Sequence, residues 1–320
     1  MGPLSPDGVQ SDAQLLRKTY QSTATRAQRE YFLYLPVDYE EDTDRLWPVL
    51  LFLHGGGERG DGVEDLDYVL LHGPLGEAWV QRRDLPFIMI GPQLPVLGMH
   101  DQVRLRDGIP RPARLPSGAP PRSDEQRPDH PKQHPMRRVC DMATTGGDAT
   151  IERARHGMPG GWQLCEDDLL NMVDATLRDY RADPGRVCLT GLSYGGFGTW
   201  YLATTHPNRW AAIAPICGAA DPELAPRLAD VQTPIWAFHG GRDQWVKHHW
   251  TYEMANALEK AGHQSVRFTV HEDRGHNSWT RVYAGEDLYQ WLLSQRLPQA
   301  GEPLPPGPDD AELPAGNEEQ

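Results

Sequence analysis

The chain has 320 residues, four cysteines and a formal net charge of −14. An acidic balance of this size argues against nucleic acid or an anionic membrane surface as the main partner. No apolar run reaches the roughly 18 residues that a membrane-spanning helix needs, and the amino-terminal residues lack the pattern of a signal peptide. We therefore expect a soluble, cytoplasmic protein with no nucleic-acid or membrane partner, whose oligomeric state the sequence leaves open.

Composition divides the chain into four parts. Residues 1–24 are a polar lead, and residues 301–320 are an acidic, proline-rich tail of the kind that stays disordered. Residues 98–160 are an irregular insertion rich in proline and arginine. The remainder of residues 25–300 is long enough for one α/β domain. The insertion follows a predicted strand at the edge where substrates bind in such sheets, so it is either a flexible, solvated loop or a lid.

Strand and helix patterns alternate along this domain. Strands are predicted at residues 31–35, 48–53, 87–90, 186–190, 210–216, 234–238 and 266–270. Helices are predicted at residues 167–180, from the end of the fourth strand to about 205, at 248–261 and at 286–296, with a turn at 183–185. Continuous apolar runs such as 48–53 are typical of strands buried on both faces. The alternation predicts an α/β fold with a doubly wound, mostly parallel sheet and the insertion after its second buried strand.

The pentapeptide Gly191-Leu192-Ser193-Tyr194-Gly195 connects an apolar strand to a helix of small residues. A Gly-x-Ser-x-Gly sequence in this position is the nucleophile elbow, a turn so tight that glycines must flank the serine. The turn exposes the serine hydroxyl at the carboxyl edge of the sheet. Ser193 is therefore the candidate nucleophile.

A serine hydroxyl needs a base, and the base needs a group that orients it. Asp243 follows the predicted strand 234–238, and His276 lies in the loop after the next strand. The order Ser, Asp, His along the chain is that of the α/β-hydrolase arrangement. We predict that Ser193 attacks, that His276 takes and returns the proton, and that Asp243 fixes the tautomer of His276 and stabilises its charged form.

An oxyanion hole requires two backbone N–H groups near the serine. One is expected from Tyr194, and the other from the glycine-rich loop after strand 48–53, where Gly56 is the preferred donor and Gly57 the next. Residues 55–60 also match the Gly-x-Gly-x-x-Gly fingerprint of dinucleotide sites. The polar, irregular residues that follow lack the helix and the ribose-binding acid which that site requires, so the oxyanion interpretation is preferred.

Several other polar residues have a structural interpretation. His239 is predicted to be a packed turn histidine, not a base. His248 and His249 open a helix without a third ligand at a suitable spacing, so no metal is predicted, and nothing points to a cofactor. Glu58 and Arg59 are expected to form an ion pair within their loop.

Three tryptophans lie near the candidate catalytic residues in sequence. Trp200, Trp245 and Trp279 belong either to the core or to an aromatic substrate pocket, and Trp245 and Trp279 are the candidate substrate contacts. Cys188 and Cys217 lie in apolar runs, where cysteine behaves as a small buried hydrophobe.

Together these motifs resemble the esterase and predicted-peptidase branch of the α/β-hydrolase superfamily, which includes dienelactone hydrolase, feruloyl esterases and polyhydroxybutyrate depolymerases and is related to prolyl oligopeptidase. The segments that carry the resemblance are residues 51–62, 183–200, 214–218, 235–246 and 268–279. The resemblance implies the α/β-hydrolase fold and the cleavage of ester or peptide bonds without a metal.

We therefore expect a serine hydrolase that cleaves carboxylic esters through an acyl-enzyme, with a small-molecule ester or a short peptide as its substrate. The alternatives are a serine peptidase of the prolyl-oligopeptidase type and a non-catalytic binding protein with the same fold. The acyl and alcohol groups of the substrate stay open.

Overall fold

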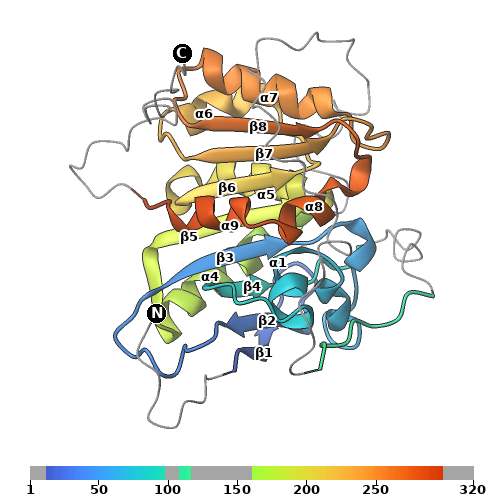
Figure 1. Ribbon diagram of the computed structural model, residues 1–320, viewed down its shortest axis with the longest axis vertical. Helices are drawn as coiled ribbons and strands as arrows, with labels where there is room; N and C mark the ends of the chain where they lie inside the picture. Colours follow the sequence, from blue (N-terminus) through green and yellow to red (C-terminus); the bar gives the residue numbers. More distant parts are fainter. Residues whose placement is uncertain (1–11, 98–107, 117–160, 298–320) are drawn as a thin grey trace, which may run out of the picture.

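The computed structural model describes residues 12–97, 108–116 and 161–297, which build an eight-stranded sheet between two layers of helices (Figure 1). The strands are β1 (Gln14–Gln21), β2 (Gln28–Leu35), β3 (Trp47–Leu53), β4 (Ile88–Gly91), β5 (Ala182–Leu192), β6 (Ala212–Ile216), β7 (Ile235–Gly240) and β8 (Val266–His271). Their order across the sheet is β1-β2-β4-β3-β5-β6-β7-β8. The pairs β1–β2 and β2–β4 are antiparallel, and all the other neighbours are parallel. The predicted doubly wound, mostly parallel sheet is confirmed.

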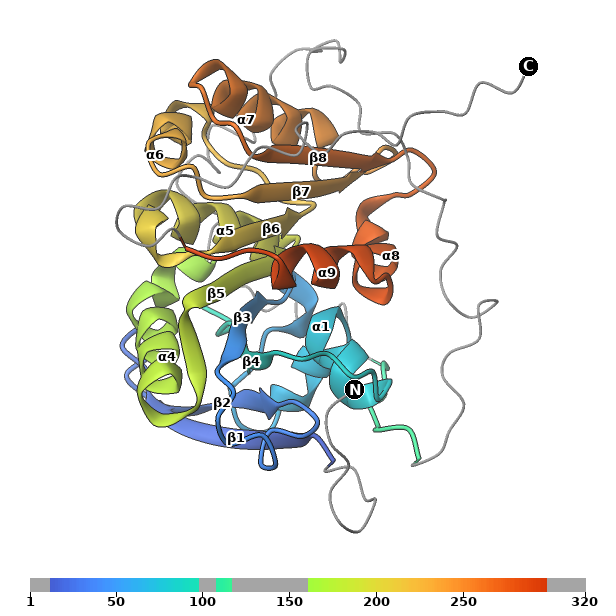
Figure 2. The same ribbon diagram turned by 60° about the vertical axis from the view of Figure 1, so that its left-hand side comes forward.

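Helices cover both faces of the sheet. The α-helices are α1 (Gly73–Leu75), α4 (Glu166–Asp179), α5 (Tyr194–Thr205), α6 (Ala225–Ala229), α7 (His248–Lys260), α8 (Trp279–Ala284) and α9 (Asp287–Leu293). The short 3-10 and π turns are η1 (Gly56–Glu58), η2 (Leu66–Leu70), η3 (Gly76–Val80), η6 (Trp162–Cys165), η7 (Pro207–Arg209), η8 (Pro222–Leu224) and η9 (His276–Ser278). Figure 2 shows α4, α5, α6 and α7 on one face and α1, α8 and α9 on the other.

Two apolar cores follow from the alternation of side chains along buried strands. In β3, Val49 and Leu51 join the core beneath α4, α5 and α7, whereas Leu50 and Phe52 join the core beneath α1, α8 and α9. Successive side chains of a strand point to opposite faces, so a strand between two helical layers must be apolar at every position. All seven residues of β3 are buried, as its continuous apolar run predicts.

The ordered domain begins earlier than residue 25, where the sequence placed its start. Residues 14–21, assigned to the polar lead, form β1 and pair with β2 along its whole length. From Leu16 on, their side chains alternate between half-buried and exposed, because an edge strand with one solvated face does not need an apolar sequence. Arg17, on β1, also forms ion pairs with Glu30 on β2 and with Asp67 in η2, which attach the edge strand to the rest of the domain.

The predicted turn at 183–185 lies inside a strand. The pairing of β3 with β5 skips from Trp47 opposite Ala182 to Val49 opposite Val187, so the turn residues bulge out of the ladder. The Asp183 side chain accepts a hydrogen bond from the N–H of Gly185 at 2.9 Å. The local turn chemistry is therefore present, and β5 continues past it.

The insertion and the tail fall mostly outside the described residues, so their predicted roles are still predictions. The described part of the insertion, residues 108–116, packs against η3. The N–H of Leu115 donates to the carbonyl of Val80 at 3.0 Å, and the Arg114 guanidinium lies 3.6 Å from the ring centre of Trp79. Among the described residues, no helix is long and apolar enough to cross a membrane.

Candidate active site

Ser193 lies at the sharp turn between β5 and α5. Its backbone has φ 52° and ψ −116°, a left-handed conformation that a non-glycine residue adopts only when its surroundings impose it. A Cβ at Gly195 would lie 1.7 Å from the carbonyl oxygen of Leu53, and one at Gly191 would lie 2.3 Å from the carbonyl oxygen of Gly195. The flanking glycines are therefore required by close backbone contacts, and the turn has the geometry expected of a nucleophile elbow.

The three predicted catalytic side chains lie together at the carboxyl ends of the strands. His276 Nε2 is 2.9 Å from Ser193 Oγ, and His276 Nδ1 is 2.7 Å from Asp243 Oδ2. The carboxylate can only accept when ionised, so Nδ1 carries the proton and the lone pair of Nε2 faces the serine hydroxyl. Asp243 is buried, whereas Ser193 and His276 are partly open to solvent. This arrangement can transfer a proton from the hydroxyl to the imidazole.

Asp243 is held as a carboxylate by four donors. Its Oδ1 accepts hydrogen bonds from the N–H groups of Trp245 and Val246, at 2.9 and 3.0 Å, and its Oδ2 faces His276 and, at 3.3 Å, His239 Nε2. Burial alone would raise the pKa of Asp243, but the hydrogen bonds from the two imidazoles and from the backbone outweigh it. The pKa of this carboxyl therefore lies well below its ordinary value.

The glycine-rich loop that the sequence assigned to the oxyanion hole lies against the elbow. A Cβ at Gly55 would be 3.6 Å from the Cβ of Ser193 and 2.8 Å from the Leu192 side chain. Gly56 and Gly57 follow directly and form the start of η1. Tyr194 is the first residue of α5. The structure therefore brings the three predicted oxyanion residues to the neighbourhood of the candidate nucleophile.

His54 fixes the start of this loop from inside the protein. Its Nε2 accepts a hydrogen bond from the N–H of Leu94 at 2.9 Å, and its Nδ1 lies 2.7 Å from the Gly55 carbonyl. These contacts are those of a neutral ring with its proton on Nδ1. Trp162 Nε1 donates to the carbonyl of His54 at 3.1 Å, so the backbone of this loop is bonded from two sides.

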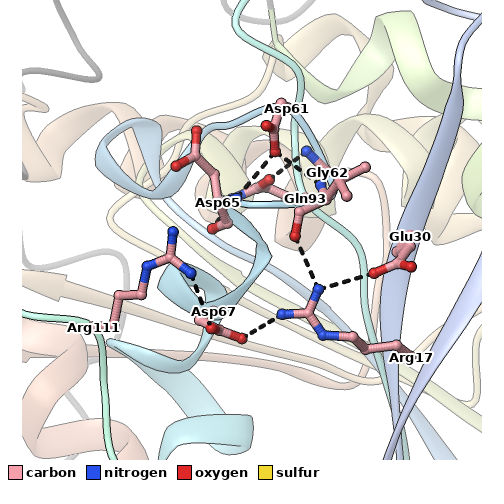
Figure 3. A network of polar contacts seen from close by, with 9 residues as sticks. Arg17, Glu30, Asp61, Gly62, Asp65, Asp67, Gln93 and Arg111 are labelled. Carbon is pink, nitrogen blue, oxygen red and sulfur yellow. Dashed lines mark hydrogen bonds and ion pairs between the residues drawn. The ribbon is translucent and has the colours of Figure 1, made fainter.

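Two buried polar residues that the sequence analysis missed hold the rest of the loop. Gln93 accepts a hydrogen bond from the N–H of Gly62 and donates to the carbonyls of Glu58 and Asp65, at 2.7–2.9 Å. Arg29 donates to carbonyl groups along the same stretch. Figure 3 shows Gln93 beside Gly62, Asp61 and Asp65. A glutamine two residues after the end of an apolar strand was the available signal.

The two charged residues of the loop, Glu58 and Arg59, lie close to imidazole and aromatic rings. Glu58 lies 4.0 Å from His54 and 3.9 Å from His72. The guanidinium of Arg59 lies 4.1 Å from the ring centre of Tyr194, so this buried cation packs on the residue after the candidate nucleophile. Burial lowers the pKa of Arg59, and its contacts with Tyr194 oppose this shift.

The tryptophans divide between core and surface. Trp200 is fully buried, whereas Trp245 is 80 % exposed. Trp279 packs edge-on against the imidazole of His276, with 5.0 Å between ring centres. Trp279 lines two hollows, a partly open one of about 140 Å³ between residues of α1, η3 and α8 and a more open one of about 350 Å³ that Trp245 also lines. Trp245 and Trp279 therefore flank the candidate site, and their contact with substrate is a prediction.

The sequence interpretation of His239 accounts for only part of its environment. His239 is packed within the fold at the end of β7, with 0 % of its surface exposed, but its ring also touches the Asp243 carboxylate. A strand-end histidine four residues before the candidate aspartate is the pattern that could have revealed this contact.

Comparison with known proteins supports the fold. The model of the dienelactone hydrolase family matches residues 141–284, a little under half of the chain. A poly(3-hydroxyalkanoate) depolymerase C of Paucimonas lemoignei is 47% identical over 47 residues, which is 15% of this chain and 11% of that protein. The chain thus spans only a small part of the length of this relative.

Solved structures share the fold at low sequence identity. A thermostable esterase superposes with a TM-score of 0.56 and 23% identity over 88% of this chain and 63% of that one. A ferulic acid esterase has a TM-score of 0.53 and 16% identity, over 88% and 97% of the two chains. An S-formylglutathione hydrolase from Staphylococcus aureus has a TM-score of 0.53 and 12% identity, over 89% and 98%. The fold of these structures is that of the α/β-hydrolases.

Proposed function

We propose that this chain, an α/β-hydrolase-fold protein with a match to the dienelactone hydrolase family, is a serine hydrolase that cleaves carboxylic esters through an acyl-enzyme intermediate. The observation that carries the proposal is the unbroken chain of hydrogen bonds from Asp243 through His276 to Ser193, with distances of 2.7 and 2.9 Å. A general base within hydrogen-bond reach of a hydroxyl, itself oriented by a buried carboxylate, is the arrangement that activates a serine.

In the proposed reaction, Ser193 Oγ attacks the ester carbonyl carbon while its proton passes to His276 Nε2. The negative charge that develops on the carbonyl oxygen is met by the N–H groups of Tyr194 and Gly56, with Gly57 as the next candidate. Asp243 stabilises the imidazolium without taking its proton.

Collapse of the tetrahedral intermediate breaks the bond to the alcohol, which leaves with the proton from His276. A water molecule then attacks the acyl-enzyme with His276 as the base, and the acid is released with Ser193 restored. No group besides those of the chain and water is required to balance the two half-reactions.

The nucleophile assignment is tested by covalent labelling. A fluorophosphonate reacts with an activated serine, so we expect stoichiometric labelling of the wild type and none of Ser193→Ala. Ser265→Ala is the matched control, because this serine lies at the start of β8, away from the site, and its loss leaves labelling unchanged. Equal labelling of wild type and Ser193→Ala, or labelling of neither, contradicts the proposal.

The choice between ester and peptide substrates needs a second experiment. The Ser193-Tyr194-Gly195-Gly196 stretch also fits serine peptidases of the prolyl-oligopeptidase type, and one structural match at a TM-score of 0.52 and 12% identity is an acylaminoacyl peptidase from Pyrococcus horikoshii. We expect p-nitrophenyl esters of graded chain length to be hydrolysed faster than aminoacyl naphthylamides. Faster hydrolysis of the amides would favour the peptidase assignment. Labelling of Ser193 without hydrolysis of either series would favour a non-catalytic binding protein.

A further inference from the structure

Cys217 follows β6 and lies beside the candidate catalytic residues, although the proposed reaction does not use it. Its Sγ atom, a carboxylate oxygen of Asp243 and a ring nitrogen of His276 all lie within 4.8 Å of one another. Cys217 is fully buried, and Asp243 is buried as well. The thiol therefore lies next to the pair of side chains that would orient the catalytic base.

The backbone of Cys217 matches that of Ser193 on the neighbouring strand. Leu192 is paired with Ile216 in the parallel ladder of β5 and β6, so Ser193 and Cys217 follow at equivalent positions. Their φ angles are 52° and 50°, a left-handed conformation that residues with a side chain adopt only where their surroundings impose it. The N–H of Cys217 donates to the carbonyl of Phe238 on β7 at 2.9 Å. Two strained residues thus lie side by side at the carboxyl edge of the sheet.

The thiol connects the end of β6 to the turn that carries His276. Cys217 Sγ lies 3.0 Å from Ser278 Oγ, and Ser278 is also fully buried. Ser278 and His276 belong to the same single turn of 3-10 helix, η9, with one residue between them. Hydrogen-bond geometry within such a turn is poor, so a buried contact at one end of η9 helps to fix the position of the other end.

The thiol also lies near the end of the strand that leads to Asp243. Burial raises the pKa of the Cys217 thiol to about 12, and the negative charge of Asp243 adds to the rise. The Ser278 hydroxyl and the N–H groups of Gly240 and Ser278 oppose it, so groups from both loops lie close to the sulfur. Gly240 ends β7, and its carbonyl accepts the N–H of Asp243 at 3.2 Å. The un-ionised thiol is therefore adjacent to the backbone that holds each member of the pair.

From these contacts we infer that Cys217 is a positioning residue for the Asp243–His276 pair, and that its thiol fixes the spacing of the two loops that carry them. A glycine would take the left-handed backbone of position 217 without strain. It would also leave the buried Ser278 hydroxyl without its sulfur partner, so the side chain accounts for the strained residue. The expected effect on turnover rests on the proposed function, whereas the contacts do not.

Replacement of Cys217 by alanine removes the sulfur and keeps the Cβ. We expect kcat for a p-nitrophenyl ester to fall about 10-fold with little change in KM, because the base is displaced while the substrate surface is not. Cys188→Ala is the matched control, since Cys188 is also fully buried, on β5, and its thiol lies 3.8 Å from the Leu292 carbonyl. Its kcat stays at the wild-type value. Equal kcat values for the two alanine variants overturn the inference.

Two further variants separate positioning from packing and strain. Cys217→Ser keeps a hydrogen-bonding atom at the end of the side chain, so we expect it to recover most of the kcat that the alanine variant loses. Cys217→Gly relieves the backbone strain, so it should resist urea at least as well as Cys217→Ala and still lose kcat to the same degree. Recovery of kcat in the glycine variant, or equal losses in the serine and alanine variants, contradicts the positioning role.

A double-mutant cycle tests the contact with Ser278. Ser278→Ala alone should lower kcat about as much as Cys217→Ala does. The double variant should lose little more than either single variant, because both substitutions remove one shared contact. Losses that multiply would mean that the two residues act independently, which contradicts the inference.

A measurement without substrate separates this inference from the proposed function. The proton between His276 Nδ1 and Asp243 Oδ2 lies in a hydrogen bond of 2.7 Å, and a proton in such a bond gives a low-field ¹H NMR signal. We expect this signal, assigned by its loss in His276→Gln, to shift in Cys217→Ala and to stay unchanged in Cys188→Ala. An unchanged signal in a folded Cys217→Ala protein overturns the inference. Failure of the proposed function would appear instead as absent labelling of Ser193 in the wild type, with the NMR difference retained.

Discussion

Asp243 accepts hydrogen bonds on both oxygens, two from backbone N–H groups and two from imidazoles. The backbone bonds fix the rotamer of the side chain, and the imidazole bonds fix where Oδ2 points. A residue that is bonded at four points cannot adjust when one partner changes. The orientation of His276 is therefore sensitive to any change at this carboxylate.

Replacement of Asp243 by asparagine tests that sensitivity. The amide offers an N–H where His276 Nδ1–H needs an acceptor, so the ring takes the wrong tautomer and turnover falls by about 10⁴. The measurement is kcat for a p-nitrophenyl ester, with circular dichroism to verify the fold. Asp179→Asn is the control, because this aspartate is exposed on α4 and, among the described residues, its carboxylate bonds to Arg178 alone; its kcat stays at the wild-type value. Activity of Asp243→Asn near wild type would assign the orienting role to another acid.

The sequence predicted the three candidate catalytic residues better than the residues that hold the site in place. The motifs around Ser193, Asp243 and His276 indicate their neighbours, because each motif lies at a strand end and parallel strands end at one edge. Gln93 contacts residues 28–35 positions away, which its local sequence does not specify, whereas the contact of His239 with Asp243 spans only four positions and had a local signal.

The backbone of the nucleophile elbow at Ser193 is packed closely against neighbouring strands. The carbonyl oxygen of Leu53, at the end of β3, lies where a Cβ of Gly195 would have to be placed, with a separation of 1.7 Å. Backbone atoms of a central strand cannot move away as the end of a side chain can. The tight packing of α5 against β3 and β5 is therefore a condition for the position of Ser193.

We expect Gly195→Ala to destabilise the fold by about 4 kcal/mol or more, a cost reserved for overpacking in a rigid core. The free energy of unfolding in urea measures this change. Gly275→Ala is the matched control beside His276, because the nearest atom to its Cβ would be the Arg242 carbonyl at 3.8 Å; we expect a change within about 0.5 kcal/mol. A Gly195→Ala protein as stable as the wild type would contradict the packing argument.

The loop between β3 and η2 depends on Gln93 in the same way. Gln93→Leu removes three hydrogen bonds and leaves one N–H and two carbonyl groups buried without that partner, at a cost of about 3 kcal/mol in the free energy of unfolding. Because residues 55–57 belong to the same loop, we also expect kcat to fall about 10-fold with little change in KM.

Gln264→Leu is the control for that variant, since Gln264 is exposed and, within the part of the chain that the structure describes, its side chain bonds to the Gly262 carbonyl alone. Its stability and kcat stay near the wild-type values. A Gln93→Leu protein with wild-type kcat but lower stability would mean that the glycines keep their position without this anchor.

Helices and strands were predicted correctly where burial determines which residue types the segment contains. The strands of the parallel sheet were found because buried strands are continuously apolar, and the helices α4, α7 and α9 because amphipathic helices repeat every three to four residues. The helix α5, which is buried on nearly all sides, was found because a helix follows the nucleophile-elbow motif. The edge strand β1 and the short elements α1, α6 and α8 have neither pattern. Tertiary contacts determine these elements, so a local sequence window cannot identify them.

The stability of the whole molecule in acid depends on groups that the folded protein keeps in one protonation state. His263 precedes β8, is 5 % exposed, and accepts the N–H of Ser265 on Nδ1 at 3.1 Å, so the fold requires its neutral form. Burial lowers the pKa of His263 to about 4. Asp243 is the opposite case, because the fold requires its charged form and its pKa is held well below the ordinary value.

His263 and Asp243 affect the stability of the fold in different pH ranges. Between about pH 6.5 and 4 the unfolded chain binds a proton at His263 that the folded protein does not, so stability falls as the pH falls, by about 3 kcal/mol over the window. Asp243 contributes stability that is fully present above about pH 3.9 and is lost below that value, as the pH approaches the depressed pKa.

We therefore expect His263→Gln to flatten the dependence of unfolding free energy on pH between 7 and 4, by about 3 kcal/mol relative to the wild type. Urea titrations at half-unit pH intervals measure both curves. Below pH 4 the two curves should run parallel, because the remaining loss comes from carboxylates such as Asp243 that both proteins contain. Parallel curves from pH 7 to 4 would mean that His263 binds a proton equally well in the folded and the unfolded protein. The hydrogen bond that His263 accepts from Ser265 excludes this unless the turn before β8 opens in acid.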